Sequence, residues 1–320
     1  MINGVLSSIL DTIGNTPMVN LSKMTKGLEG QIFAKVEFFN PGASKKDRIA
    51  LQIIEDAEKS GKLKKGQTVV ELTSGSTGIG LAVVCAVKGY PFVPVMSKGN
   101  SIERAIMMKA LGAKLVLVNQ MPNSTPGQVS GEDLNLVEQE TQRLVKELNA
   151  FRPDQFNNTS NLSAYELHVG EEIWQQTDGK VDVFVDFVGT GGSFAGCMKA
   201  LKKHNPDIRG YMVEPTNAAF YSSGSLSNPN HKIQGGGYCM DLPLVDKSLV
   251  EGYISISDEE SIETTRRLAS TEGIFAGYSS GANIAAALKL LKEKEKGKNI
   301  CLLINDTGLK YMSNDLFEKI

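Results

Sequence analysis

Histidine, cysteine and tryptophan are scarce in this sequence of 320 residues, which contains three histidines, four cysteines and one tryptophan. The histidines are not paired at metal-ligand spacing, and the cysteines form no Cys-x-x-Cys motif. We therefore expect no metal site, no disulfide framework and no catalytic triad built on histidine.

Neither sign of charge is in excess, because 34 Lys and Arg residues face 36 Asp and Glu residues. A balanced chain has no general attraction to nucleic acid or to anionic lipid. No apolar run approaches the roughly 20 residues of a membrane span, and the amino terminus lacks the basic start and apolar run of a signal peptide. We expect no nucleic-acid partner, no membrane association and a cytoplasmic location.

Short apolar runs alternate with helical patterns along the chain. Strands are expected at residues 68–71, 92–96, 114–118, 181–185, 211–213 and 300–304, and the main helices at 49–60, 80–88, 102–111, 132–148, 193–204 and 258–272. Continuous apolarity marks strands that are covered on both faces. The pattern predicts an α/β fold with mostly parallel sheets. Since single cores stop growing near roughly 250–300 residues, we expect two lobes.

A pair of lysines precedes the first helical pattern, in the segment Asn40-Pro-Gly-Ala-Ser-Lys-Lys-Asp-Arg48. The positive end of a helix dipole disfavours a further cation, so a lysine there is neutral more often than a free lysine of pKa about 10.4. A neutral amine is the form that attacks an aldehyde. Taken alone, however, two lysines before Asp-Arg are more typical of solvated surface charges.

Three loops rich in glycine and hydroxyl groups each precede an apolar helical pattern. They are Glu71-Leu-Thr-Ser-Gly-Ser-Thr-Gly-Ile-Gly80, Phe187-Val-Gly-Thr-Gly-Gly-Ser193 and Phe275-Ala-Gly-Tyr-Ser-Ser-Gly-Ala282. Amides and hydroxyls at a helix start can bind an anion. The first loop suits a phosphate or a carboxylate, and the second suits a phosphate. A dinucleotide is less favoured because the Gly-x-Gly-x-x-Gly spacing is absent, and any one loop alone would be explained by helix capping.

Together with Ile13-Gly-Asn-Thr-Pro-Met18, these segments resemble the cysteine synthase and cystathionine β-synthase family of fold-type II pyridoxal phosphate (PLP) enzymes. The match spans nearly the whole chain. The resemblance implies a fold like that of tryptophan synthase β, with two lobes that each hold a mostly parallel twisted sheet flanked by helices. It also implies a larger cofactor-binding domain (residues 1–39 and 151–320), a smaller mobile substrate-binding domain (residues 40–150) and a homodimer.

The resemblance assigns roles residue by residue. Lys46 holds PLP as a Schiff base and moves the Cα proton. Ser279 faces the pyridine nitrogen and leaves it unprotonated, which makes the ring a moderate electron sink suited to loss of a β-substituent. Ser76 lies at the cofactor ring, and the phosphate cradle comprises Gly189, Thr190, Gly191, Gly192 and Ser193. The substrate carboxylate is bound by Thr73, Ser74 and Thr77, with Gln155 as their partner.

The chain also departs from the family pattern. Ser76 replaces an asparagine that contacts the cofactor ring oxygen, Ala43 replaces a glycine, and Lys45 takes a position that is usually apolar. The segment Gln234-Gly-Gly-Gly-Tyr-Cys-Met-Asp-Leu-Pro243 is longer than usual and introduces Asp241. We hypothesise that Asp241, with Tyr238, activates water for addition to the aminoacrylate intermediate. The alternative is a surface aspartate that points away from the cleft.

The resemblance implies PLP-dependent β-replacement in cysteine metabolism, by way of an aminoacrylate formed from an O-activated serine or from cysteine. Sulfide or a thiol is the nucleophile. One alternative is a lyase that releases sulfide from cysteine, with water as nucleophile and Asp241 as base, or a serine or threonine deaminase. Another is an inactive PLP-binding partner protein, which intact Lys46 and an intact cradle disfavour. The polar segment 119–131 resembles the cystathionine synthase arrangement and leaves homocysteine open as second substrate.

Overall fold

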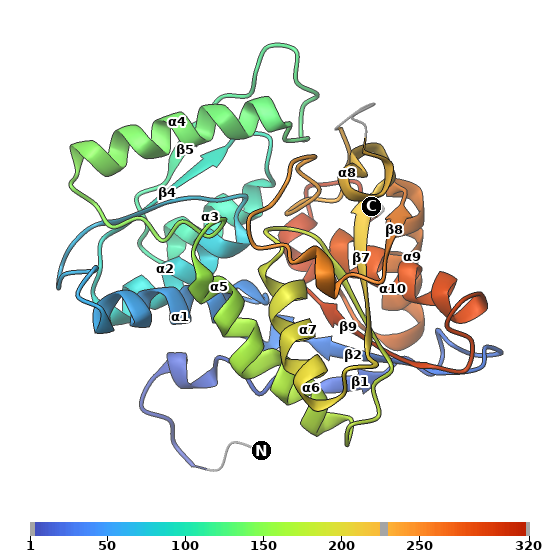
Figure 1. Cartoon of the computed structure of the whole chain (residues 1–320). Helices are drawn as coiled ribbons and strands as arrows, with labels where there is room; N and C mark the ends of the chain where they lie inside the picture. The colour runs from blue at the N-terminus through green and yellow to red at the C-terminus, as the bar shows by residue number, and fades with distance from the viewer. Residues whose placement is uncertain (1–3, 225–229, 318–320) are drawn as a thin grey trace.

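Two separate β-sheets form the centre of the molecule (Figure 1). The structure is a computed structural model, and it describes residues 4–224 and 230–317. The larger sheet has the strand order β1-β2-β9-β6-β7-β8, and the smaller has the order β3-β4-β5. All neighbouring strands run parallel except β1 and β2. The predicted α/β class with mostly parallel sheets is therefore confirmed.

The strands are β1 (Met18–Asn20), β2 (Gln31–Val36), β3 (Val69–Leu72), β4 (Phe92–Ser97), β5 (Val116–Val118), β6 (Val183–Phe187), β7 (Arg209–Pro215), β8 (Gly252–Ile256) and β9 (Asn299–Ile304). All six expected strands are confirmed within a few residues. Three strands, β1, β2 and β8, were not predicted from the sequence. Lys35 interrupts the apolar run of β2, and β8 is a half-buried strand at the edge of its sheet.

The helices are α1 (Lys46–Lys59), α2 (Ser76–Lys88), α3 (Ile102–Ala110), α4 (Gly131–Glu147), α5 (Thr159–Ala164), α6 (Gly170–Gln176), α7 (Gly192–His204), α8 (Phe220–Ser223), α9 (Asp258–Glu272) and α10 (Tyr278–Lys292). A π-helical turn, Tyr165–Val169, joins α5 to α6. The expected helices are confirmed, although α1 and α2 begin earlier than predicted. Polar residues fill these first turns, so apolar periodicity alone could not locate the starts.

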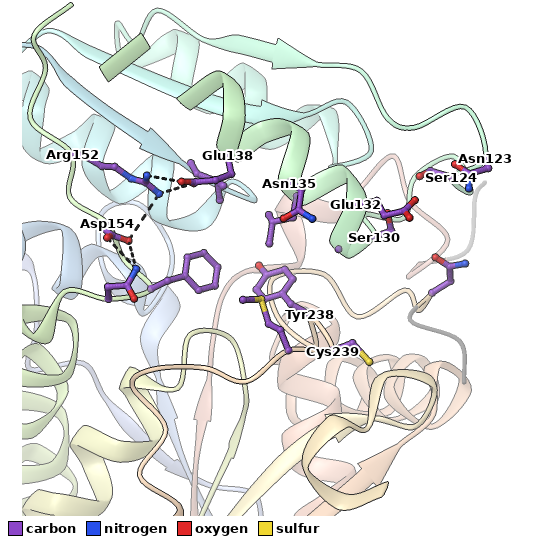
Figure 2. A pocket seen from close by; sticks show the side chains of 17 residues that line it. Asn123, Ser124, Ser130, Glu132, Asn135, Glu138, Arg152, Asp154, Tyr238 and Cys239 are labelled. Atoms are coloured by element: carbon purple, nitrogen blue, oxygen red, sulfur yellow. Dashed lines mark hydrogen bonds and ion pairs between the residues drawn. The ribbon is translucent and has the colours of Figure 1, made fainter. Parts of the chain in front are cut away.

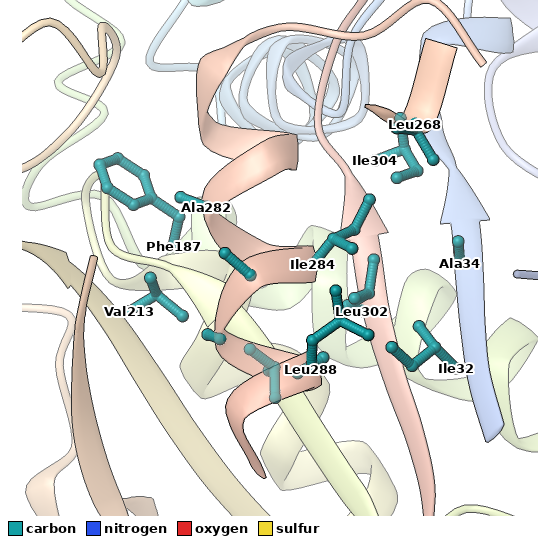
Figure 3. Close-up of a cluster of buried hydrophobic side chains, with 14 of the residues drawn as sticks. Ile32, Ala34, Phe187, Val213, Leu268, Ala282, Ile284, Leu288, Leu302 and Ile304 are labelled. Atoms are coloured by element: carbon teal, nitrogen blue, oxygen red, sulfur yellow. The ribbon is translucent and has the colours of Figure 1, made fainter. Parts of the chain in front are cut away.

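The larger sheet is covered on both faces, because successive side chains of a strand point to opposite sides. On β9, Ile300, Leu302 and Ile304 join the core beneath α10, whereas Cys301 and Leu303 join the core beneath α7. Figure 3 shows the first of these cores, in which α10 packs over β9, β6 and β2. This burial explains the continuous apolar run that predicted the strand.

The smaller sheet is built in the same way. Val69 and Phe92 pack with α1 and α2, and Val70 and Val95 pack with α4 on the other face. Its three strands come from residues 69–118, and all strands of the larger sheet lie outside residues 40–150. The domain boundaries and the mobility of the smaller domain stay predictions. Among the described residues, no helix has the length and apolarity that crossing a membrane requires.

Candidate active site

Lys46 lies at the first position of α1, in a cavity between the two sheets. Three loops that follow the carboxyl ends of strands meet there, which is where α/β proteins bind ligands. The loop after β3 contributes Ser76, the loop after β6 contributes Gly189, and the segment after β9 contributes Asp306. The other residues that line the cavity are Ser44, Lys45, Phe187, Gln234, Gly235, Ser279, Asn305 and Tyr311. The structure thus brings four of the predicted site residues, Lys46, Ser76, Gly189 and Ser279, to one cavity, and their roles stay predictions.

The environment of Lys46 favours its neutral amine. Burial, followed by the positive charge of the adjacent Lys45, lowers the pKa of Lys46 to about 7. Within residues 4–224 and 230–317, no hydrogen-bond acceptor contacts Lys46 Nζ. The amine is therefore free to react with an aldehyde near neutral pH, as covalent catalysis by lysine requires.

The loop between β6 and α7 forms a concave backbone next to Lys46. A side chain at Gly189 would place its Cβ 3.8 Å from Lys46 Nζ and 3.0 Å from the carbonyl oxygen of Gly235, so only glycine leaves this space open. Gly191 has a φ of +87°, which brings the chain into the first turn of α7. The first amides of a helix have no acceptor within the helix and attract an anion. This geometry fits the phosphate of PLP.

Thr190 and Ser193 border this loop and are almost completely buried. Thr190 Oγ1 accepts a hydrogen bond from Asn161 Nδ2 at 2.9 Å, so its own hydrogen stays available for an anion. Ser193 Oγ instead donates to the buried carboxylate of Asp186 at 2.5 Å. The two hydroxyls of the predicted cradle are therefore not equivalent.

Ser279 lies in the first turn of α10, on the wall of the Lys46 cavity. Its hydroxyl accepts a hydrogen bond from Asn305 Nδ2 at 3.0 Å. The hydroxyl hydrogen then points away from that amide, and it can donate to an unprotonated ring nitrogen. Asn305 Oδ1 and Asp306 Oδ1 are buried without a partner beside this cavity, and such atoms call for a ligand or water. The residues present fit PLP.

The loop that was predicted to bind the substrate carboxylate is tightly organised. Thr73 Oγ1 accepts hydrogen bonds from the amides of Gly75 and Gly78, both at 2.9 Å. Gly75 has a φ of +122°, and a Cβ there would lie 2.1 Å from the side chain of Arg104. The Thr73 hydroxyl therefore fixes the conformation of the loop and directs the amino terminus of α2 toward the cavity.

Thr77 and Ser74 have partners outside this loop. Thr77 Oγ1 donates to Gln155 Oε1 at 2.6 Å, which places Gln155 beside the loop as predicted. Ser74 Oγ shares a hydrogen bond of 2.9 Å with the Tyr238 hydroxyl. None of these four side chains is among those that line the Lys46 cavity, where Ser76 is the residue contributed by this loop. Their contact with a substrate stays a prediction.

Three residues near Ser76 were not predicted from the sequence as functional candidates: Asp306, Lys310 and Tyr311. Asp306 Oδ2 accepts hydrogen bonds from Tyr311 at 2.8 Å and from Ser76 at 3.4 Å. Lys310 Nζ donates to the carbonyl of Ala43 at 3.1 Å, and burial lowers the pKa of Lys310 to about 8. Ala43 itself has a φ of +57°, the left-handed conformation that glycine adopts most easily. These contacts tie the segment after β9 to the lysine loop.

Asp241 lies elsewhere, contrary to our hypothesis that it acts as a base in the site. Its side chain is 67% exposed, and its carboxylate is 3.5 Å from Lys247 Nζ. It does not line the Lys46 cavity. The next residue, Leu242, is buried and takes the inward side of the chain, which leaves Asp241 facing solvent. In this structure, the alternative of a surface aspartate is correct.

A larger cavity of about 680 Å³ opens between α4 and the segment 238–240 (Figure 2). Asn123, Ser124 and Ser130 line it from one side, and Tyr238 and Met240 from the other. Tyr238 also lines a small cavity that shares Gln234 and Gly235 with the Lys46 cavity. The small cavity therefore shares lining residues with both the larger cavity and the Lys46 cavity.

Comparisons with known proteins identify the family of this chain. The family described as "Pyridoxal-phosphate dependent enzyme" matches residues 9–306. Cysteine synthase of Staphylococcus aureus is 41% identical over 313 residues, with 98% of this chain and 97% of that protein covered. O-ureido-L-serine synthase of Streptomyces lavendulae is 39% identical over 317 residues, which is 99% of this chain and 94% of that protein.

A solved structure extends the likeness to three dimensions. A hydrogen sulfide-producing enzyme of Fusobacterium nucleatum superimposes with a TM-score of 0.89 at 39% identity and covers 96% of this chain and 100% of that one. Sequence similarity and fold are thus shared along nearly the full length. The chain belongs to the pyridoxal-phosphate dependent enzymes, in the cysteine synthase and cystathionine β-synthase family.

Proposed function

We propose that this enzyme catalyses β-replacement on an O-activated L-serine, with sulfide or a thiol as nucleophile. The bond between Cβ and the ester oxygen breaks, a bond between Cβ and sulfur forms, and the activating group leaves as an anion. The observation that carries the proposal is the pairing, in one cavity, of a lysine with a pKa of about 7 and a neutral hydroxyl, Ser279. Relatives named cysteine synthase and O-ureido-L-serine synthase support it.

Lys46 supplies the proton transfer in this proposal. With a pKa of about 7, its amine accepts a proton from the substrate Cα and releases it again near neutral pH. A base whose pKa matches the working pH contributes typically about 10²–10⁴-fold to the rate. PLP, when bound, supplies the electron withdrawal that acidifies this proton. Thr77, Gln155 and the amides of α2 orient the substrate carboxylate.

Product analysis tests the proposal. Purified enzyme is incubated with O-acetylserine plus sulfide, with serine plus homocysteine, and with cysteine alone, and the amino-acid products are identified. The proposal predicts rapid formation of cysteine in the first reaction, and none in a Lys46→Ala variant. Formation of pyruvate and ammonia from serine, or of 2-oxobutyrate and ammonia from threonine, without any β-substituted product, would contradict it.

The alternative of a sulfide-releasing cysteine lyase retains one favourable observation, since a structural neighbour is described as a hydrogen sulfide-producing enzyme. The exposed position of Asp241 removes the base that we assigned to this reaction. We therefore expect Asp241→Asn to leave the ratio of serine to cysteine products unchanged. A selective loss of serine formation from cysteine would restore the role of Asp241.

The larger cavity favours a second candidate nucleophile, a thiol amino acid such as homocysteine. The 119–131 segment contributes Asn123, Ser124 and Ser130 to its polar wall, and Tyr238 and Phe156 form an apolar wall. Sulfide is too small to require a cavity of this size. We expect Ser130→Ala and Asn135→Ala to raise the KM for homocysteine while the KM for sulfide stays constant.

We also propose a cytoplasmic homodimer. Ile102 and Ile106 of α3 are 53% and 59% exposed, and Leu309 and Met312 beside them are 62% and 55% exposed. The backbone amide and hydroxyl of Ser313 donate to the Glu103 carboxylate, so the two segments form one surface. Clustered exposed apolar side chains mark interaction surfaces. Sedimentation should show a dimer, and the substitution Ile106→Asp should dissociate it. The control substitution Leu148→Asp, at an exposed position at the end of α4, should leave the dimer intact.

A further inference from the structure

A buried charged cluster lies behind the phosphate cradle, and the chemistry above does not use it. Lys45 Nζ lies 2.9 Å from each carboxylate oxygen of Asp186 and 3.0 Å from Ser193 Oγ. Asp186 is fully buried and Lys45 is 6% exposed. Asn283 Nδ2 adds a hydrogen bond of 3.3 Å to the same carboxylate. The ammonium, carboxylate and hydroxyl thus form a closed network.

This network determines what Ser193 can offer to a phosphate. A hydroxyl has one hydrogen, and that of Ser193 goes to Asp186 Oδ2, while its oxygen accepts from Lys45. An ammonium has three hydrogens, and all three of those on Lys45 face acceptors. Lys45 and Asp186 together therefore fix the orientation of the Ser193 hydroxyl.

The negative charge of Asp186 is unfavourable beside a site that binds an anion. Asp186 lies on β6, three positions before Gly189, and its neighbours along the strand are the apolar residues Val185 and Phe187. A buried carboxylate without a partner is strongly unfavourable, and a phosphate dianion nearby would add repulsion. Lys45 is the cation that contacts this carboxylate within the part of the chain that the structure describes.

The same lysine is also fixed through its backbone. Tyr165, in the π-helical turn, donates its hydroxyl hydrogen to the carbonyl of Lys45 at 3.2 Å. π-Helical turns occur frequently at functional sites. Because Lys45 immediately precedes Lys46, its side chain and backbone connect the cradle to the amine that reacts with the cofactor.

We propose that Lys45 is a positioning residue of the phosphate cradle: its ammonium neutralises Asp186 and orients Ser193, which allows a phosphate dianion to bind beside a buried carboxylate. The inference depends on the cofactor and not on the reaction proposed above. A binding experiment without substrate therefore tests it separately from the identity of the products.

The test compares PLP with pyridoxal, which reacts with the same lysine but has no phosphate. The cofactor is removed from each purified holoenzyme, and affinity is measured from the visible absorbance on adding either aldehyde. Lys45→Met should weaken PLP about 30-fold or more, because breaking a buried pair leaves its partner uncompensated. The affinity for pyridoxal should fall much less. The loss of Lys45 raises the pKa of Lys46, which affects both aldehydes alike, but pyridoxal has no phosphate to be repelled by the unpaired Asp186.

Two further variants make the result decisive. The double variant Lys45→Met/Asp186→Asn has no unpaired charge, so its affinity for PLP should return to within about fivefold of the wild type. Asp186→Asn alone keeps the cation and should bind PLP at least as tightly as the wild type. The ³¹P NMR resonance of bound PLP should shift in both single variants, a signal that a purely structural role would not move.

Three outcomes would overturn the proposal. Equal losses of PLP and pyridoxal affinity in Lys45→Met would show a general structural role. Unchanged PLP affinity in that variant would show that the cluster does not act on the phosphate. A double variant as weak as Lys45→Met would show that Asp186 is not the charge that Lys45 neutralises. Where Lys45→Met does not fold, the double variant is compared with Asp186→Asn instead, and a much lower PLP affinity of the double variant would show that Lys45 acts on something other than Asp186.

Discussion

Asn305 Nδ2 donates a hydrogen bond of 3.0 Å to Ser279 Oγ, and both residues line the cavity of Lys46. Asn305 follows β9, and Ser279 lies in the first turn of α10, so the contact joins a strand of the larger sheet to a helix that covers it. By accepting from the amide, the serine hydroxyl keeps its own hydrogen for the cofactor ring.

Ser279→Ala should lower kcat about tenfold, which corresponds to the loss of one hydrogen bond in a buried site. Asn305→Ala should give a smaller decrease, because the serine remains but loses its orientation. Steady-state kinetics at saturating PLP measures both effects. If Asn305→Ala were more harmful than Ser279→Ala, the amide itself would be the group that contacts the ring.

The pH dependence of cofactor capture should report the environment of Lys46. Burial and the charge of Lys45 lower the pKa of Lys46 to about 7. Below that pH the ammonium cannot attack an aldehyde, and above it the amine is neutral. Capture of PLP by cofactor-free enzyme should therefore accelerate as pH rises through about 7 and level off above about 8, whereas an ordinary lysine would continue to gain reactivity toward a pKa of about 10.4.

Stopped-flow absorbance measures this profile, with Lys46→Arg as the variant that should show no capture at any pH. A midpoint near 10 would mean that the amine is solvated in the cofactor-free enzyme and that the cavity around it is open to water.

Thr77 and Gln155 should matter for substrate binding more than for turnover. Thr77→Val removes the donor of the 2.6 Å hydrogen bond to Gln155 and leaves a buried amide oxygen unpaired. Such a loss is worth about 1–1.5 kcal/mol, so we expect the KM for the amino-acid substrate to rise about tenfold with little change in kcat.

The matched control is Thr141→Val. Thr141 is fully buried, and its hydroxyl donates to the carbonyl of Val137 within α4 at 2.7 Å. This change should leave KM constant. Equal effects of the two substitutions would assign Thr77 a role in folding alone.

Much of the site could be predicted because it is encoded in local motifs. Lys46 and Ser279 lie in the first turns of α1 and α10, Gly189 lies in the glycine-rich loop before α7, and the structure brings all three to one cavity. Asn305 and Asp306 could also have been identified from the sequence. They are polar residues directly after the apolar run of β9, and ligands bind at the carboxyl ends of parallel strands.

Other parts of the site depend on tertiary packing, which a motif does not encode. Lys310 contacts Ala43 across 267 positions of sequence, and no local pattern marks that pair. Asp241 was assigned to the site by its position along the chain alone. Which side of an irregular segment faces the cleft is decided by its neighbours, here by buried Leu242.

Arg48 should be essential for the stability of the lysine loop. It donates to both oxygens of Glu37, at 2.7 and 2.8 Å, and to both oxygens of Glu172, at 2.7 and 2.8 Å. Arg48→Met would leave the fully buried Glu37 carboxylate without its cation. Breaking a buried pair in this way costs about 3–5 kcal/mol.

A comparison with an exposed pair isolates the contribution of burial. Arg143 forms ion pairs with Glu140 and Glu147 on α4, but its side chain is 55% exposed. Arg143→Met should therefore cost at most about 1 kcal/mol. Urea denaturation at equal PLP saturation measures the free energy of unfolding of both variants. A small loss for Arg48→Met would show that water or a neighbouring group compensates Glu37, and the anchoring of α1 would then rest on the apolar contacts of Ile49 and Ile53.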